Sequence, residues 1–175
     1  MGSYPYGKDE VCKWIRQNFP IDSTVLDVGA QDGTWQTLLP EYRNMDAIEI
    51  YKPNADKLTK YRAVYNEDIR TWTYDHYDLI IFGDIIEHLI VKDAQTVLRY
   101  ARPRCTDLIV AVPFLYPQGA AYGNPYEIHK QDDLTDEIFH QRYKGLEVLF
   151  DPGHNYMYYH KRTSGKNKRI KETNA

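Results

Sequence analysis

Cysteine is scarce in this sequence, and no apolar run is long enough to cross a membrane. The two cysteines, Cys12 and Cys105, are far apart and form no C-x-x-C pattern, which excludes a disulfide framework of the kind that holds small secreted domains together. The first residues also lack the charged-then-apolar order of a signal peptide. A chain of 175 residues can bury a core without disulfides or structural metals. We therefore expect one soluble, cytoplasmic domain that does not bind membranes.

A surplus of basic residues is also absent from most of the chain, whose formal net charge is −3. Six basic residues and one acidic residue follow His160, which leaves 16 basic and 24 acidic residues in the first 160, a net charge of −8. Phosphate contacts need a basic surface, so this balance disfavours a nucleic-acid partner. Residues 163–175 are basic and polar without apolar periodicity. We expect them to form a solvated, disordered tail, with an RNA-binding or partner-binding tail as the alternative.

The chain is organised around a turn that has two glycines, one fewer than the three of a dinucleotide-binding turn. Residues 25–33 (VLDVGAQDG) predict a buried strand that ends in an acid and turns through Gly29 and Gly33 into a helix. In an open α/β sheet this first turn is a ligand-binding corner, where glycine lets the backbone approach the ligand. The spacing does not fit the G-x-G-x-x-G pattern of a pyrophosphate site. Asp27 would repel a diphosphate and attract a ligand that carries an ammonium group.

A second acid, Glu49, stands twenty residues after Gly29, at the end of a strand predicted for residues 46–50. A carboxylate at this spacing can accept two hydrogen bonds from a ribose diol. The alternative is an exposed acid at a strand end. Agreement with the acidic turn upstream favours the ribose role.

Two blocks of the sequence resemble motifs of one enzyme family. The turn from Asp27 to Gly33 resembles the D-x-G-x-G-x-G first motif of class I S-adenosylmethionine (SAM) dependent methyltransferases, with Gln31 in place of the middle glycine. Residues 77–89 (YDLIIFGDIIEHL) are similar to the fourth motif of the small-molecule methyltransferases. The resemblance covers roughly residues 9–162. It implies SAM as cofactor, with S-adenosylhomocysteine as product.

The resemblance also implies roles for individual residues. The family commonly has an acid and an apolar residue beside the adenine, which Asp68 and Ile69 match, and Asp84 would face the methionine portion. The predicted cofactor-binding residues are Asp27, Gly29, Ala30, Gln31, Gly33, Glu49, Ile50, Asp68, Ile69, Gly83 and Asp84. We predict no metal site.

The catalytic candidates are Glu87 and His88, near the transferring methyl, and His129 in a later loop. His88 could take a proton from the attacking group, or it could only fix its turn by binding a backbone group. Residues 115–133 are rich in Tyr, Pro, Gly and Asn without apolar periodicity, which is typical of a lid or binding loop. We expect Tyr126, Glu127 and His129 to contact the substrate, and residues 4–7 could contact ligand.

Strands and helices alternate along the sequence up to residue 114, which indicates a parallel sheet. Helices are expected at residues 9–19, 34–39, 53–61, 93–101 and 134–144, the first of them on the sheet edge. Strands are expected at residues 24–28, 46–50, 64–69, 77–82, 107–114, 146–150 and 156–160. The last two form a hairpin. We therefore predict a Rossmann-like, doubly wound α/β fold whose mostly parallel seven-stranded sheet has an antiparallel last strand, over residues 1–162.

The predicted function is SAM-dependent transfer of a methyl group to an oxygen or nitrogen atom. Because the domain is close to the minimum for this fold, we expect a small-molecule acceptor such as a sugar or secondary metabolite. One alternative is a non-catalytic, methyltransferase-like protein that binds nucleosides, which the bulk of Gln31 supports. A less favoured one is an RNA methyltransferase that uses the basic tail. The sequence leaves the oligomeric state open.

Overall fold

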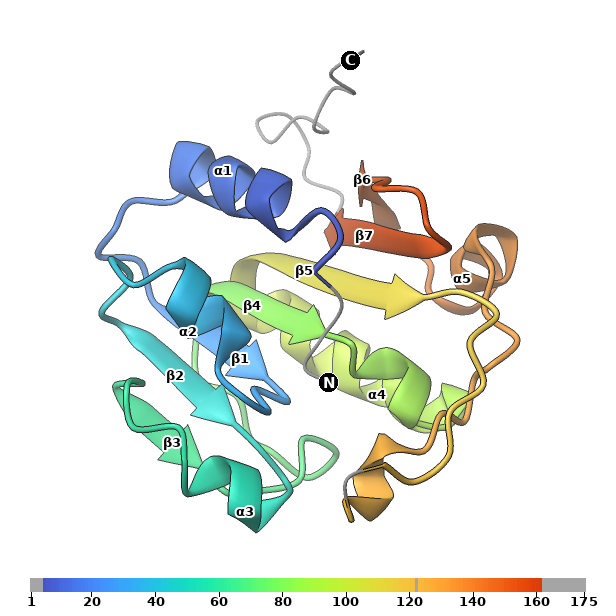
Figure 1. Cartoon of the computed structure of the whole chain (residues 1–175). Helices are drawn as coiled ribbons and strands as arrows, with labels where there is room; N and C mark the ends of the chain where they lie inside the picture. The colour runs from blue at the N-terminus through green and yellow to red at the C-terminus, as the bar shows by residue number, and fades with distance from the viewer. Residues whose placement is uncertain (1–4, 122, 162–175) are drawn as a thin grey trace.

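The computed structural model describes residues 5–121 and 123–161, so the expected contact of Tyr4 and the expected disorder of residues 163–175 lie outside the described residues. Seven strands form one sheet in the order β3-β2-β1-β4-β5-β7-β6 (Figure 1). The strands are β1 (Val25–Val28), β2 (Met45–Ile48), β3 (Ala63–Tyr65), β4 (Tyr77–Gly83), β5 (Cys105–Pro113), β6 (Leu146–Phe150) and β7 (Tyr156–Lys161). The first five run parallel. Strand β7 is antiparallel to β5 and β6, between which it lies, so the predicted sheet is confirmed.

Five α-helices connect or precede the strands: α1 (Lys8–Asn18), α2 (Thr34–Leu38), α3 (Lys52–Ala55), α4 (Val91–Ala101) and α5 (Asp136–Arg142). Three single turns of 3₁₀-helix are η1 (Ile86–His88), η2 (Arg102–Arg104) and η3 (Pro125–Glu127). None of the helices within residues 5–121 and 123–161 has the length and apolar character that a bilayer crossing requires.

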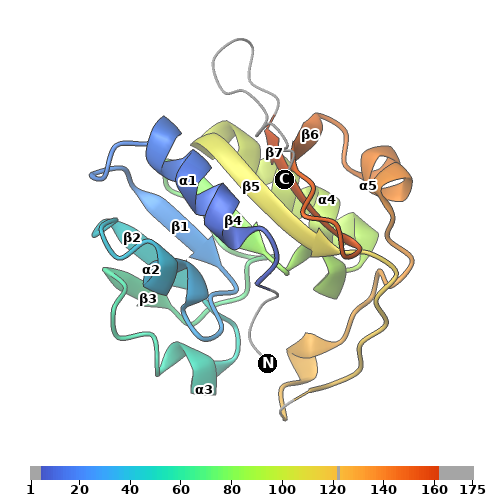
Figure 2. The ribbon, with the colours of Figure 1, turned by 45° about the horizontal axis from the view of Figure 1, so that its top comes forward.

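The sheet is covered on both faces, as the continuous apolar runs of its parallel strands predict (Figure 2). One buried cluster joins apolar side chains of α4 and α5 to one face of the sheet. The other joins α1 and α2 to the opposite face, where Trp14 and Ile15 share a core with Ile81 and Ile109 of β4 and β5. The helix α1 therefore packs over the central strands, and its predicted place on the sheet edge is wrong.

Two elements end well before the predicted residue, and α5 is also shorter than the helix predicted for residues 134–144. The helix predicted for residues 53–61 ends at Ala55, although Leu58 and Tyr61 are still buried. The strand predicted for residues 64–69 ends at Tyr65. Asp68 lies beyond it in a turn, where its carboxylate accepts the Arg70 N–H at 2.9 Å and its carbonyl accepts the Thr71 N–H at 3.0 Å. These local bonds compete with the strand ladder and stop the strand.

Parallel strands end at one edge of a sheet, so the carboxyl ends of β1 to β5 lie together. This strand register brings three of the predicted site residues to the same edge of the sheet. Asp27 in β1 pairs with Ile81 in β4, and Gly83 ends β4 beside Ala111 of β5. Glu49 directly follows β2. The loops beyond this edge form the site described next.

Candidate functional site

A cavity of about 410 Å³ opens at the carboxyl edge of the sheet. This volume is within the range of small-molecule sites, about 300 to 1,000 Å³. Its lining comes from the ends of β1, β2 and β4, from residues 67–70 and from the loop after β5. The lining includes Asp27, Gly29, Ala30, Gln31, Glu49, Ile50, Asp68, Ile69, Gly83, Asp84, Glu87, His88 and His129. Gly33 is the one predicted cofactor-binding residue outside the lining, and Tyr6 and Gly7 of the leader also lie outside it. Gly33 directly precedes α2 and has a φ of 77°.

The turn after β1 depends on Gly29, whose φ is 70°. A Cβ atom at this position would lie 1.8 Å from Cδ1 of Ile85, so a side chain would collide with the segment after β4. The N–H group of Gly29 donates to the carbonyl of Ile48 at 2.8 Å, which ties the turn to the end of β2. Glycine is thus needed for both the backbone angle and the close approach.

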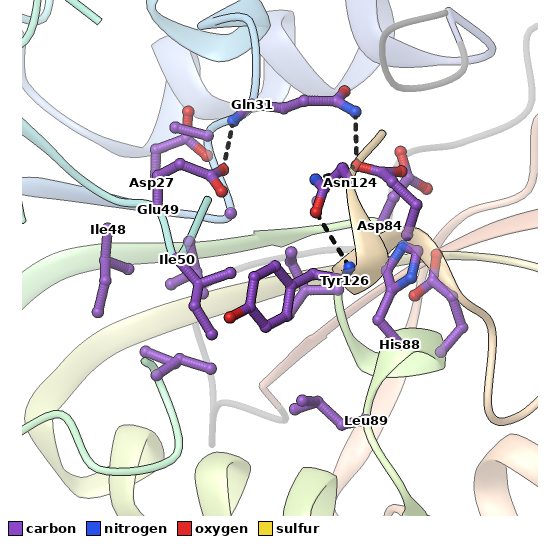
Figure 3. Close-up of a pocket in the computed structure, with 18 of the residues that line it drawn as sticks. Asp27, Gln31, Ile48, Glu49, Ile50, Asp84, His88, Leu89, Asn124 and Tyr126 are labelled. Atoms are coloured by element: carbon purple, nitrogen blue, oxygen red, sulfur yellow. Dashed lines mark hydrogen bonds between the residues drawn. The ribbon is translucent and has the colours of Figure 1, made fainter. Parts of the chain in front are cut away.

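Gln31 occupies a left-handed conformation, with a φ of 46°. Its N–H group donates to Oε2 of Glu49 at 3.0 Å, and its side-chain amide donates to Oε1 of Glu127 at 3.0 Å. Figure 3 shows the side chain extended from the turn toward the loop that carries Asn124. Gln31 therefore connects two walls of the cavity, and its side chain points away from the turn itself.

Asp27 is 1% exposed. The hydroxyl of Tyr61 donates to its Oδ2 at 2.5 Å. Burial raises the pKa of the Asp27 carboxyl to about 7, although the Tyr61 hydrogen bond and the positive charge of Lys8 act in the opposite direction. Near neutral pH this group can change between its neutral and ionised forms, so a cationic ligand beside it would favour the ionised form.

Glu49 is also buried, at 5% exposure. Its two carboxylate oxygens accept the N–H groups of Gln31 and Tyr51, at 3.0 and 2.7 Å. Burial raises its pKa, and the two backbone hydrogen bonds oppose that rise. Each oxygen keeps a second lone pair, so the side chain is held in place while it can still accept from a ligand.

Asp68 lines the cavity together with Ile69. The guanidinium of Arg70 binds both of its carboxylate oxygens, with the Nε contacts at 3.0 and 2.9 Å. This pairing lowers the pKa of Asp68. Ile48, Ile50 and Leu89 supply apolar walls, and the ring of Tyr126 extends toward Ile50 (Figure 3).

The end of β4 is packed closely. A Cβ atom on Gly83 would lie 2.6 Å from the indole Nε1 of Trp35. Asp84 follows in a left-handed conformation, with a φ of 57°, and accepts the Tyr156 hydroxyl at 2.5 Å. The backbone thereby turns sharply, and η1 enters the wall of the cavity.

Glu87, His88 and His129, the three catalytic candidates, lie together at this end. One ligand atom from each side chain lies within 4.8 Å of the other two. The rings of the two histidines are 4.6 Å apart between centroids, edge to face. Burial lowers the pKa of His88 to about 4 and also lowers the pKa of His129, so both imidazoles are neutral at pH 7.

The loop after β5 is structured by amide side chains. Glu127 accepts from the side chains of Gln31 and Asn124, each at 3.0 Å, and its backbone carbonyl accepts from Gln118 at 2.8 Å. Pro5 of the leader also lines the cavity. Of the three expected substrate contacts in the loop, Tyr126 and His129 line the cavity, and Glu127 lines it while organising the loop.

Sequence reasoning missed several supporting residues. Tyr61 and Tyr156 place hydroxyls on Asp27 and Asp84, and the abundance of tyrosine was the only signal for them. Lys8 of α1 is 3% exposed and lies 4.6 Å from the Trp35 ring centroid. Its charge acts on both Asp84 and Asp27, yet Lys8 precedes the helix predicted for residues 9–19 and no role was predicted for it.

Charge distinguishes this cavity from a phosphate site. Eight carboxyl groups line it, from Asp27, Asp32, Glu49, Glu67, Asp68, Asp84, Glu87 and Glu127. Arg70 and Lys130 are the two cationic side chains in the lining. A negatively charged, partly enclosed cavity concentrates cationic ligands.

Comparison with known proteins bears on the fold. No family model and no curated protein matches the sequence. Among solved structures, a SAM-dependent methyltransferase from Clostridium acetobutylicum is similar, with a TM-score of 0.68 and 12% identity over 91% of this chain and 91% of that chain. The N-terminal domain of EvdMO1, solved in the presence of S-adenosylhomocysteine and D-fucose, is also similar, with a TM-score of 0.65 and 12% identity. That match covers 88% of this chain and 82% of the EvdMO1 domain.

The mitomycin 7-O-methyltransferase MmcR is similar with a TM-score of 0.62 and 12% identity. The match covers 89% of this chain and 54% of MmcR, so this chain spans about half the length of MmcR. These likenesses agree with the strand order and the antiparallel β7 described above. The chain therefore has the fold of the class I SAM-dependent methyltransferases.

Proposed function

We propose that this protein is a SAM-dependent methyltransferase that acts on an oxygen or nitrogen atom of a small molecule. One observation carries the proposal: acids at or beyond the carboxyl ends of three adjacent strands line a single cavity together with the glycine turn after β1. They are Asp27, Glu49 and Asp68. A nucleoside that carries positive charge suits this arrangement, whereas a diphosphate does not.

Each part of the cofactor has a suitable partner in the cavity. Asp27 would bind the ammonium group, and the free lone pairs of Glu49 would accept from the ribose hydroxyls. Ile50 and Ile69 would contact the adenine, with Asp68 near its amine. Gly83 and Asp84 would lie along the methionine portion, with Gly29, Ala30 and Gln31 in the turn beside it.

Methyl transfer from a sulfonium needs little covalent help from the protein. A lone pair of the acceptor forms a bond to the methyl carbon while the carbon–sulfur bond breaks, and the sulfur keeps that electron pair. S-adenosylhomocysteine leaves, and the acceptor loses one proton. The enzyme contributes in-line positioning and a place for that proton. Glu87, His88 and His129 form the polar wall that would contact the acceptor.

Two structural neighbours favour a sugar as acceptor. EvdMO1 was solved with D-fucose present, and KedS8, with a TM-score of 0.52 over 62% of this chain, is a sugar N-methyltransferase. Sugars offer neighbouring hydroxyls, and the polar end of the cavity is suited to such groups. The structure of Gln31 weakens the alternative of a non-catalytic nucleoside-binding protein, because its side chain leaves the turn. The RNA alternative depends on a tail outside the described residues.

Calorimetric titration with S-adenosylhomocysteine tests the cofactor assignment. We expect binding to the wild-type chain, and affinity about 10 to 100-fold lower in Glu49→Gln, because hydrogen bonds to a charged group contribute about 1.5 to 3 kcal/mol. Glu137→Gln, on the exposed side of α5, is the matched control and should bind like wild type. Absence of binding, or equal affinity in Glu49→Gln and wild type, would overturn the assignment.

A further inference from the structure

The cluster of Glu87, His88 and His129 has the composition of a metal site. Glu87 and His88 come from η1 after β4, and His129 comes from the loop after β5, so the fold brings them together from separate segments. Their ligand atoms lie within 4.8 Å of one another. One carboxylate and two imidazoles are the ligands of the facial triad that binds divalent transition metals.

Each imidazole has its Nδ1 directed at a backbone carbonyl. Nδ1 of His88 lies 3.4 Å from the carbonyl of Ile128, and Nδ1 of His129 lies 2.6 Å from the carbonyl of Tyr116. A carbonyl only accepts, so each Nδ1 carries the hydrogen and each Nε2 keeps its lone pair. Histidines that bind metals almost always donate their other ring N–H in this way.

Glu87 supplies an independent observation. It is 1% exposed, and within residues 5–121 and 123–161 neither of its carboxylate oxygens has a hydrogen-bond partner. A buried carboxyl without partners is costly, so its retention in a wall of the cavity calls for an explanation. A cation bound between it and the histidines would provide one.

The backbone holds the three side chains together. The carbonyl of Glu87 accepts the N–H groups of Lys130 and Gln131, at 2.8 and 3.2 Å. The side-chain amide of Gln131 donates to the carbonyls of Ile86 and Leu89, at 2.8 and 2.9 Å. These bonds fasten the loop that carries His129 to η1, so the cluster is assembled by the chain itself.

We propose that Glu87, His88 and His129 bind one divalent transition-metal ion, at a site that the sequence did not predict. Imidazole ligands favour Mn²⁺, Fe²⁺, Co²⁺ or Zn²⁺ over Mg²⁺, which prefers oxygen ligands. Three protein ligands leave coordination positions open toward the cavity. Nearby Asp84 adds negative charge, since its carboxylate acts on both Glu87 and His129.

The open positions point to a class of acceptor. This step rests on the proposed methyltransferase function. An ion with two or more open positions can chelate a pair of neighbouring oxygens, so a vicinal diol, as in a sugar, fits the site. The ion would orient one hydroxyl toward the methyl donor and make its proton easier to lose.

Titration of the full chain, stripped with a chelator, with Mn²⁺ and with Co²⁺ tests the site. Electron paramagnetic resonance measures free Mn²⁺, and visible absorption reports the coordination of Co²⁺. We expect one ion per chain, and affinity at least tenfold lower in Glu87→Gln, His88→Gln and His129→Gln. His76→Gln, an exposed histidine outside the cavity lining, is the matched control and should bind like wild type.

Thermal unfolding without metal separates ligation from a structural role. Glu87→Gln should be about as stable as wild type, because the amide has nearly the size of the carboxyl and the carboxyl oxygens have no hydrogen bond to lose. The variant should no longer be stabilised by Mn²⁺. Absence of stoichiometric binding, or binding that none of the three substitutions weakens, would overturn the metal site. S-adenosylhomocysteine binding, measured in parallel with chelator present, shows separately whether the methyltransferase assignment holds.

Discussion

Replacing Asp27 with asparagine should change how the stability of the protein depends on pH. Burial raises the pKa of Asp27 from 3.8 to about 7, so between these values the folded chain binds a proton that the unfolded chain has released. The free energy of unfolding therefore falls as pH rises through this window and is constant, for this group, below and above it. The asparagine side chain in Asp27→Asn would have nearly the same shape, could still accept from Tyr61 and would not titrate.

The magnitude follows from the width of the window. Each pH unit corresponds to about 1.4 kcal/mol, so the whole shift corresponds to about 4 kcal/mol. Between pH 5 and pH 8, the free energy of unfolding should fall by roughly 3 kcal/mol in wild type because of this group. Asp27→Asn should not show this fall. Groups that titrate in both proteins cancel in the comparison.

Urea unfolding followed by tryptophan fluorescence measures the effect at pH 5, 6, 7 and 8. The difference in unfolding free energy between Asp27→Asn and wild type should grow in favour of the variant as pH rises. A difference that stays constant within about 0.5 kcal/mol would refute the assignment of a raised pKa to Asp27. Under the proposed function, affinity for S-adenosylhomocysteine should rise about tenfold from pH 6 to pH 8 in wild type, because the ionised fraction of Asp27 rises by that factor, and not in the variant.

Other substitutions test the frame around the site. Asp107 accepts the N–H groups of Leu108 and Lys161, and its carboxylate lies 3.2 Å from Nδ1 of the buried His160. Asp107→Ala should therefore lower the free energy of unfolding, measured in urea titrations, by about 3 to 5 kcal/mol. A loss below about 1 kcal/mol would contradict a stabilising role for the Asp107–His160 pair. Gln31→Ala removes the hydrogen bond from the Gln31 side chain to the Glu127 carboxylate. Because hydrogen bonds to a charged group contribute about 1.5 to 3 kcal/mol, amide hydrogen exchange in residues 116–130 should become about 10-fold faster or more. Unchanged exchange would show that Gln31 does not fasten the loop.

The sheet was predictable because its strands carry strong local signals. Continuous apolar runs, turn residues and the hairpin near the C-terminus located all seven strands, and the resemblance implied the antiparallel β7. The predicted lengths of the helix after Pro53 and of β3 were wrong, because tertiary contacts and local side-chain hydrogen bonds override apolar spacing. Tyr61, for example, is buried in the core and donates its hydroxyl to Asp27, although it lies outside any helix.

The site was partly predictable for a related reason. Acids and glycines at strand ends share one edge of a parallel sheet, so Asp27, Glu49 and Gly83 could be brought together by topology alone. Nothing in the sequence places His129 beside His88, because their approach depends on the path of a long loop and on the bonds that Gln131 makes. The direction of the Gln31 side chain likewise depends on Glu127, a distant residue in that loop.

A crystal structure of the chain with S-adenosylhomocysteine tests directly whether the cavity binds the cofactor. We expect ligand density in the cavity at the carboxyl edge of the sheet, with the ribose hydroxyls on Glu49, the ammonium group beside Asp27 and the adenine against Ile50 and Ile69. Density for the ligand elsewhere on the chain, or a cavity without ligand at saturating concentration, would contradict it.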